Sequence, residues 1–229
     1  SFNYSLIGHT AYYVTPGSHS GNIDVIAGNV AGLAEYGLNI MAGSGIDQTA
    51  SGFEPRAHEQ GARLLAMDAR DLAFPDDSFD LAFSYDTFEH MAEPDAALGE
   101  IVRVVRPGGS IYLNFGPLYN SALGLHAYRE VPVPFCQFLF ERETLDGFVA
   151  ERGLRPIKYD ELNGWPLARY RALWKSERKR LKPVRYTEHW STEGMELVQH
   201  HPACFAPKGL GYEELAVGHI EALFEVVKT

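Results

Sequence analysis

The chain has 229 residues, 45% of them hydrophobic, and a formal net charge of −10 at pH 7. This length suits one αβ domain with a sizeable core. The negative charge argues against nucleic acid or an anionic membrane as partner, because both are bound by clustered Lys and Arg. Only two cysteines occur, and no apolar run reaches the length of a membrane span. We therefore expect a cytoplasmic protein with a small-molecule substrate.

The first elements in the chain predict a short αβ unit. Residues 1–20 are aromatic and polar, and they suit an irregular arm or a short helix over a ligand cleft. Asn22–Ala27 predicts a strand, Val30–Tyr36 a helix, and Leu38–Met41 the next strand. Together these three elements predict one βαβ unit.

Residues 64–116 alternate strands and helices with short connections. A strand over Ala62–Met67 and a later one ending at Ser84 are each followed by a polar loop, at the edge where open αβ sheets bind ligands. Pro94 suits the first turn of a helix with apolar residues at helical spacing, and Pro107-Gly108-Gly109 predicts the end of that helix.

The second half of the chain changes character. Residues 116–140 mix Pro, Gly and aromatic residues without periodicity, which is typical of a loop-rich cap over a pocket. Residues 141–153 predict a helix, and residues 163–166 open a longer amphipathic one. Lys182–Trp190 and Val217–Val227 predict two late strands.

Three ordered segments resemble a known family: MDARDLAFPDDSFD (67–80), FEHMAEPDAALGEIVRVVRPGG (88–109) and IYLNFGP (111–117). They are similar to the class I S-adenosylmethionine-dependent methyltransferases, in particular to the branch that acts on small molecules. The resemblance implies a Rossmann-like αβ sandwich. It also implies a mostly parallel seven-stranded sheet, an antiparallel edge hairpin and a cap insertion after the fifth strand.

The resemblance implies a single domain over residues 1–229 with four parts. They are an N-terminal arm (1–20), a cofactor-binding core (21–118), a cap insertion (119–162) and the C-terminal part of the core sheet (163–229).

S-adenosylmethionine is the cofactor that the resemblance implies. The glycine-rich first motif of the family falls on residues 24–30, where Asp24 and Gly28 fit the pattern. Ile26 and Val30 stand in place of two glycines, which normally allow the backbone to approach the cofactor closely.

Further positions are implied to contact the cofactor. Asp47 accepts hydrogen bonds from the ribose hydroxyls, and Asp68 and the backbone N–H of Ala69 meet the adenine ring. Ser84 and Tyr85 follow the fourth strand, beside the methionine end. Two alternatives stay open: Asp47 can cap the segment after it, and Asp68 can cap its own turn.

Two histidines are candidate catalytic bases. An imidazole with a pKa of about 6.5 can take the proton of a hydroxyl that is being methylated. His126 in the cap is preferred over His90, whose alternative role is to order the loop after the fourth strand. Asp86 and Glu89 lie in the same loop, and their spacing does not assign them a role.

Aromatic and polar side chains of the cap are candidate walls of the substrate pocket. They are Tyr119, Asn120, Tyr128 and Phe135. The alternative is that most of them form the core of the cap. His200 and His201 are adjacent but lack further ligands at metal-site spacing, so no metal is expected.

The implied activity is methyl transfer from S-adenosylmethionine to a hydroxyl oxygen of a small metabolite, such as a sugar or a natural product. The alternatives are a methyltransferase fold that no longer methylates and serves as a binding or partner subunit, or one redirected to another reaction such as a cyclisation. Ile26 and Val30 motivate these alternatives. The sequence does not indicate an oligomeric state.

Overall fold

The computed structural model describes residues 10–14, 24–28, 40–44 and 68–228. Several sequence-based predictions lie outside these ranges: the helix Val30–Tyr36, the strand Ala62–Met67 and the ribose-binding role of Asp47.

Seven strands occur in the described residues, and they form two sheets. The strands are β1 (Thr10–Val14), β2 (Asp24–Gly28), β3 (Ile40–Ser44), β4 (Phe79–Tyr85), β5 (Val105–Phe115), β6 (Leu181–Trp190) and β7 (Val217–Val226). The larger sheet has the order β3-β4-β5-β7-β6, and the smaller one pairs β1 with β2.

The larger sheet is mixed. β3, β4 and β5 are parallel to one another, whereas β7 is antiparallel to both β5 and β6. The αβ class and the antiparallel pair at the edge are therefore confirmed. The seven described strands divide into five and two, and do not form the single, mostly parallel sheet that the sequence predicts.

The N-terminal region agrees in part with the predicted βαβ unit: β2 and β3 overlap its two strands, and its helix lies outside the described residues. β2 forms its ladder with β1, antiparallel, from Thr10 opposite Gly28 to Val14 opposite Asp24. The segment TAYYV that makes β1 is rich in residues that favour strands, so part of the predicted arm is extended. Ile26 consequently lies inside a strand, opposite Tyr12.

The described helices are short. They are α3 (Pro94–Val104), α4 (Cys136–Leu139), α5 (Arg142–Glu151), α6 (Leu167–Glu177), α7 (Met195–His200), α8 (Pro202–Phe205) and α9 (Tyr212–Ala216), with 3-10 turns η1 (Phe88–His90) and η2 (Ala206–Lys208). Pro94 opens α3 as predicted. The helix ends before Pro107 because Val105 already pairs with Phe79 as the first residue of β5.

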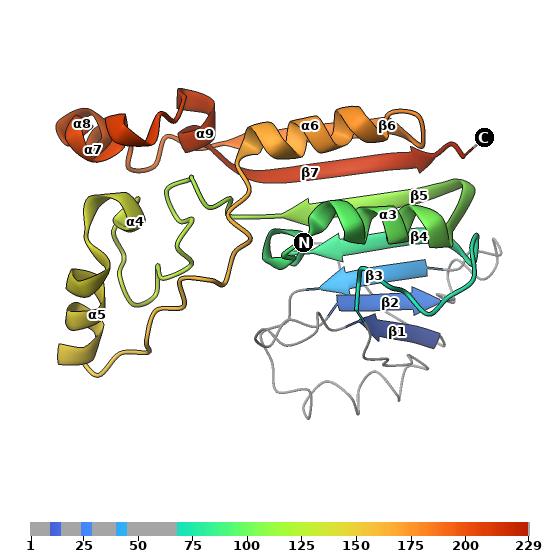
Figure 1. Cartoon of the computed structure of the whole chain (residues 1–229), viewed down its shortest axis with the longest axis horizontal. Coiled ribbons are helices and arrows are strands. Elements are labelled where there is room, and N and C mark those ends of the chain that lie inside the picture. Colours follow the sequence, from blue (N-terminus) through green and yellow to red (C-terminus); the bar gives the residue numbers. More distant parts are fainter. Residues whose placement is uncertain (1–9, 15–23, 29–39, 45–67, 229) are drawn as a thin grey trace.

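One hydrophobic core joins the larger sheet to α3 and α6 (Figure 1). Phe88, Phe115 and Tyr170 are fully buried, and the ring centroids of Phe88 and Tyr170 each lie within 5.2 Å of that of Phe115. The loop after β4 is therefore anchored in this core through Phe88.

The cap lies beyond the carboxyl ends of β4 and β5 (Figure 1). It contains α4 and α5 and has a small core of its own, which includes Leu125 and Leu145. Another small core packs Phe135 of the cap against Phe205 and Leu215 from the C-terminal part of the chain. Residues distant in sequence thus complete the cap.

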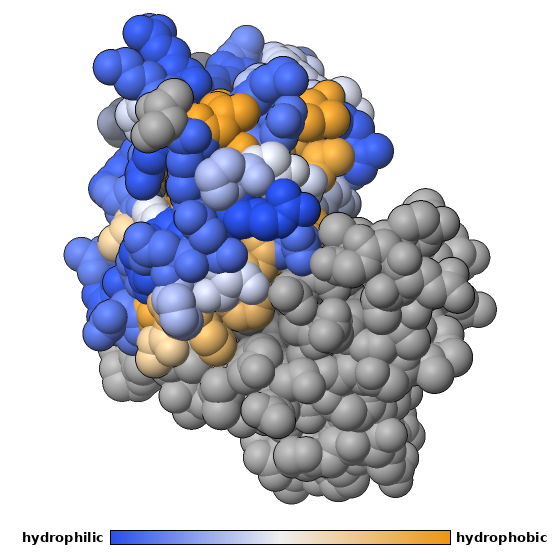
Figure 2. Space-filling view, turned by 90° about the vertical axis from the view of Figure 1, so that its right-hand side faces the viewer, coloured by the Kyte–Doolittle hydropathy of each residue, from blue (hydrophilic) through white to orange (hydrophobic). Residues whose placement is uncertain are grey.

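The end of the molecule that lies opposite the cap faces the viewer in Figure 2. Figure 2 shows that its described residues are mostly hydrophilic, with small hydrophobic areas. Within the described residues, every helix is too short or too polar to cross a membrane.

Candidate active site

A cavity of about 670 Å³ lies at the carboxyl ends of β4 and β5, a size that suits a small organic molecule. Four parts of the chain line it: the loop after β4, Gly116 and Pro117 directly after β5, the first part of the cap, and the segment before α6. Their lining residues include Asp86 and His90, then Leu125–Glu130, then Arg155–Lys158 and Glu161. Loops at this edge of an open αβ sheet are the usual place for a ligand.

Hydrogen bonds fix the loop after β4. The Asp86 N–H donates to the carbonyl of Asn114 on β5 at 2.8 Å, and Asp86 has a φ of 45°. The Asn163 N–H donates to the carbonyl of Glu89 at 2.8 Å, and its side-chain amide donates to the carbonyl of Phe88 at 3.2 Å. A positive φ at a non-glycine residue is costly, and such strain concentrates at functional sites.

His90 presents one ring nitrogen toward Glu89. Its Nδ1 lies 2.7 Å from the carbonyl oxygen of Glu161, which can only accept, so Nδ1 carries the proton. Nε2 is left with its lone pair, 3.9 Å from Glu89 Oε1. Burial lowers the pKa of His90, so the ring is neutral at neutral pH.

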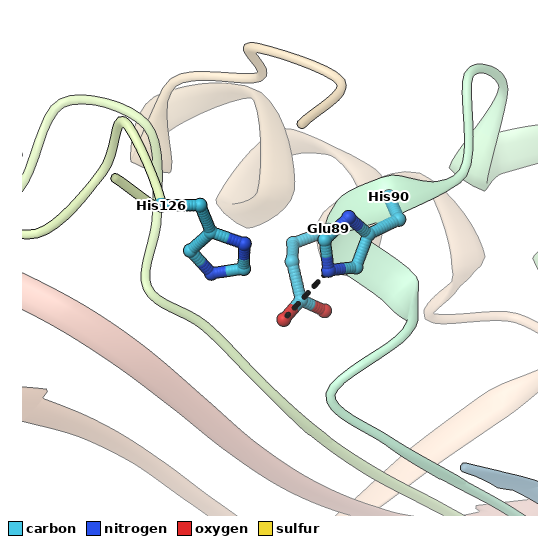
Figure 3. Close-up of side chains that lie close together, drawn as sticks. All are labelled: Glu89, His90 and His126. Carbon is cyan, nitrogen blue, oxygen red and sulfur yellow. Dashed lines mark ion pairs between the residues drawn. The ribbon is translucent and has the colours of Figure 1, made fainter. Parts of the chain in front are cut away.

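Glu89 lies beneath the two histidines (Figure 3), with only 1% of its surface exposed. Its Oε1 accepts a hydrogen bond from the Gly116 N–H at 3.1 Å. The carboxylate therefore connects the loop after β4 with the first residue after β5.

His126 reaches the same place from the cap. Its ring centroid lies 5.1 Å from that of His90, and Figure 3 shows the ring facing the Glu89 carboxylate. Burial, reinforced by the nearby His90, lowers the pKa of His126 to about 4. Its φ of 58° is a second positive value at the cavity. The two predicted catalytic residues, 36 positions apart in sequence, are thus neighbours.

Among the positions implied to contact the cofactor, Ser84 gives the clearest test of fit. Ser84 lies near the carboxyl end of β4, between Gly43 of β3 and Leu113 of β5. Its hydroxyl is buried and has no hydrogen-bond partner in the described part of the chain. A buried hydroxyl without a partner at a ligand-binding edge fits a site that a polar ligand completes.

Asp68 forms a local turn. Its carboxylate accepts hydrogen bonds from the Arg70 backbone N–H at 2.9 Å and from the guanidinium, and these hold the pKa of Asp68 below its usual range. Its carbonyl accepts from the Asp71 N–H. The turn role that the sequence left open is therefore present, and the adenine contact stays a prediction, as does that of the buried Ala69.

The other implied cofactor positions lie on strands. Asp24 and Gly28 are the first and last residues of β2, and Tyr85 is the last residue of β4. Tyr85 pairs with Ser44 of β3 and Asn114 of β5, at the carboxyl ends of these strands, where a ligand is expected.

The four candidate substrate residues occupy different places. Tyr128 lines the cavity and is 44% exposed. Phe135 is buried in the small core that the cap shares with the C-terminal part of the chain, and the Tyr119 ring packs edge-on against Phe138. The amide of Asn120 donates to Glu214 on α9 at 3.3 Å. Among the four, Tyr128 is placed to touch a molecule in this cavity.

Glu89, which lies below the two histidines of the cavity, is a residue to which the sequence assigned no role. An acidic residue one position before a histidine carries no signal by itself. Its burial depends on Gly116 and Asn163, which lie 27 and 74 positions further along the chain. Only the packing of these segments distinguishes Glu89 from a solvated carboxylate.

Comparison with known proteins shows a family match in the sheet region. Residues 26–113 match the family described as "Methyltransferase domain". A demethylmenaquinone methyltransferase of Thermus thermophilus is 40% identical over 107 residues, which are 42% of this chain and 49% of that protein. A ubiquinone/menaquinone biosynthesis C-methyltransferase of Burkholderia cenocepacia is 28% identical over 124 residues, 45% of this chain and 51% of that protein. The chain spans about half the length of these curated relatives.

Among solved structures, the PH0226 protein of Pyrococcus horikoshii is similar, with a TM-score of 0.46 and 16% identity, over 85% of this chain and 74% of that one.

Proposed function

We propose that this chain is a class I S-adenosylmethionine-dependent methyltransferase, and that it transfers a methyl group to a small-molecule acceptor held in the cavity under the cap. The observation that carries the proposal is the position of this cavity. It lies at the carboxyl ends of the parallel strands β4 and β5, where open αβ sheets bind ligands, and residues of the cap line one side of it.

S-adenosylmethionine, when bound, supplies a methyl group on a positively charged sulfur that is already activated for transfer. The residues proposed to hold it are Asp24, Gly28, Asp47, Asp68, Ala69, Ser84 and Tyr85. The protein then has to align the acceptor and assist the loss of its proton.

The acceptor is proposed to carry a hydroxyl group, and methyl transfer is proposed to its oxygen. His90 and His126 both line the cavity, and the lone pair on His90 Nε2 can accept a hydrogen bond from a hydroxyl. Tyr128 would pack against the body of the acceptor. One relative is named a C-methyltransferase of ubiquinone and menaquinone biosynthesis, so a hydroquinone, which offers both a hydroxyl and a ring carbon, belongs in the tested set beside a sugar.

The test is transfer of radioactive label from methyl-labelled S-adenosylmethionine to sugar, phenol and hydroquinone acceptors. We expect a labelled product from at least one class. His126→Asn should lower turnover by roughly 10²–10⁴-fold, the usual contribution of a group that assists proton removal. His200→Asn, at the exposed end of α7, is the control and should keep full turnover.

If the labelled methyl group is found on a carbon atom of the product, the proposal of methyl transfer to oxygen is wrong and the enzyme methylates carbon. If S-adenosylmethionine binds but none of the three classes accepts the label, the hydroxyl-bearing acceptor is excluded. If the cofactor does not bind, the chain is a methyltransferase fold with a different role.

A further inference from the structure

We propose that Glu89, His90 and His126 bind one divalent transition-metal ion, such as Zn²⁺, at the base of the cavity. One ligand atom from each residue lies within 4.8 Å of the other two. In the described part of the chain, these three form the one such group of histidine, cysteine and carboxylate side chains.

The donor set suits this class of ion. Two imidazole nitrogens and one carboxylate oxygen are a common protein ligand set of catalytic zinc sites. Ligand atoms around a tetrahedral zinc ion stand about 3.4 Å apart, given bonds of about 2.1 Å. His90 Nε2 and Glu89 Oε1 are 3.9 Å apart. Side-chain rotations that shorten the separations of the ligand atoms, which are at most 4.8 Å, by up to about 1.4 Å would close the site around an ion.

The hydrogen bonds around the three residues prepare them as ligands. The carbonyl of Glu161 holds the proton on His90 Nδ1, so that Nε2 points its lone pair toward Glu89. A backbone carbonyl on the second nitrogen is the usual support of a metal-binding histidine. The Gly116 N–H fixes Oε1 of Glu89 in the same way from the other side.

The charges around the site act in both directions. Glu89 and the neighbouring Asp86 favour a cation, and the Glu89 carboxylate is shielded from solvent, where its attraction for a cation is strong. Three cationic side chains line the same cavity and oppose it: Arg129, Arg155 and Lys158. All three residues are exposed and their charges are screened by solvent, whereas Glu89 would touch the ion directly.

Three protein ligands leave one position of a tetrahedral ion open. His90 and His126 line the cavity while Glu89 lies beneath them, so the open position faces the cavity. An acceptor hydroxyl bound there would have its pKa lowered by the ion. This last step rests on the proposed function. It assigns the histidines to holding the ion, in place of the direct proton transfer predicted from sequence.

The experiment is calorimetric titration of the full chain with Zn²⁺, repeated with Co²⁺ while the visible absorption is recorded. We expect one ion per chain and the absorption bands of tetrahedral Co²⁺ with nitrogen and oxygen ligands. His126→Asn and Glu89→Gln should each weaken binding by at least roughly tenfold. Asn tolerates the positive φ of His126, and Gln keeps an oxygen for the Gly116 N–H, so both variants should fold.

The control is the double variant His200→Asn/His201→Asn, which removes the adjacent exposed histidines and should bind the ion as the unchanged protein does. The proposal is overturned if the unchanged protein binds no ion at micromolar Zn²⁺, if His126→Asn binds as tightly, or if the double variant loses the ion. S-adenosylmethionine binding is measured on the same samples. If the unchanged protein binds S-adenosylmethionine but no ion, only the metal site is rejected. If it binds the ion but not S-adenosylmethionine, only the methyltransferase function is rejected.

Discussion

The sheet side and the cap side of the cavity are built in different ways. On the sheet side, His90 is the last residue of the 3-10 turn η1, whose first residue, Phe88, is fully buried in the main core. On the cap side, the hydrophobic cores are small, and His126 and Phe135 have positive φ angles, as Asp86 also does on the sheet side. Strained backbone persists only where its surroundings hold it in place. The comparison indicates that a large core holds the sheet side in place, whereas small cores hold the cap.

The largest effect is expected at the centre of the main core. Phe88→Ala removes a ring that packs against Phe115, Tyr170 and Trp174. Such a change in a packed core lowers the free energy of unfolding by about 3–5 kcal/mol, measured by denaturant titration. Phe140→Ala, in the cap at 41% exposure, is the matched control and should cost less than about 1 kcal/mol. If both variants lost the same free energy of unfolding, the two sides would not differ in their contribution to stability.

A second change acts on the cap alone. A Cβ added at Gly124 would lie 2.0 Å from the carbonyl oxygen of Tyr119, so Gly124→Ala must displace the segment that carries His126. Overpacking of this kind costs about 1–3 kcal/mol. Acceptor turnover should fall while the affinity for S-adenosylmethionine, measured by calorimetry, stays the same.

Gly147→Ala is the control for Gly124→Ala. Gly147 lies inside α5, where an added Cβ meets no atom within 4 Å. Alanine in a helix interior should raise the free energy of unfolding by about 0.5–1 kcal/mol. A loss of cofactor affinity in Gly124→Ala would show that cap and sheet side are not separable.

A third change tests the contact between the two sides. Glu214 on α9 accepts hydrogen bonds from the N–H groups of Leu167 and Ala168 at the start of α6, and from the amide of Asn120 in the cap. Glu214→Ala removes a capping carboxylate and should cost about 1–2 kcal/mol in thermal or denaturant unfolding. Asn120→Ala removes one of these bonds and should cost less. If Asn120→Ala destabilised the protein more than Glu214→Ala, the contact with the cap would matter more than the capping of α6.

The smallest effect concerns the sheet side of the cofactor site. Ser84→Ala removes a buried hydroxyl without a partner in the described residues, so the stability of the ligand-free protein should not fall. Loss of one hydrogen bond to the cofactor should weaken its binding by about 0.5–1.5 kcal/mol, roughly two- to tenfold. A lower melting temperature with unchanged affinity would place the Ser84 hydroxyl outside the cofactor site.

The sequence predicted the sheet side better than the cap. Pro94 and the helical spacing of Ala97, Leu98, Ile101 and Val102 are local signals, and these side chains are the buried face of α3. The extent of β6 and β7 also agrees closely with the predicted strands. β1 was not predicted as a strand, since an isolated run of TAYYV does not reveal its partner.

For the cavity, the sequence indicated the loops but not the contacts. His90 and His126 were singled out separately, and nothing in their spacing predicts a 5.1 Å separation between their rings. The burial of Phe135 and the bond from Asn120 to Glu214 join segments up to 94 positions apart, so neither could be read from local pattern.

The most direct test of the account is calorimetric titration of the protein with S-adenosylmethionine and with S-adenosylhomocysteine. We predict one binding site per chain for both compounds. Asp47→Ala should weaken this binding by about 1.5–3 kcal/mol, roughly ten- to a hundredfold, without lowering the melting temperature of the ligand-free protein. The absence of binding by the unchanged protein at millimolar concentrations of both compounds would contradict the account.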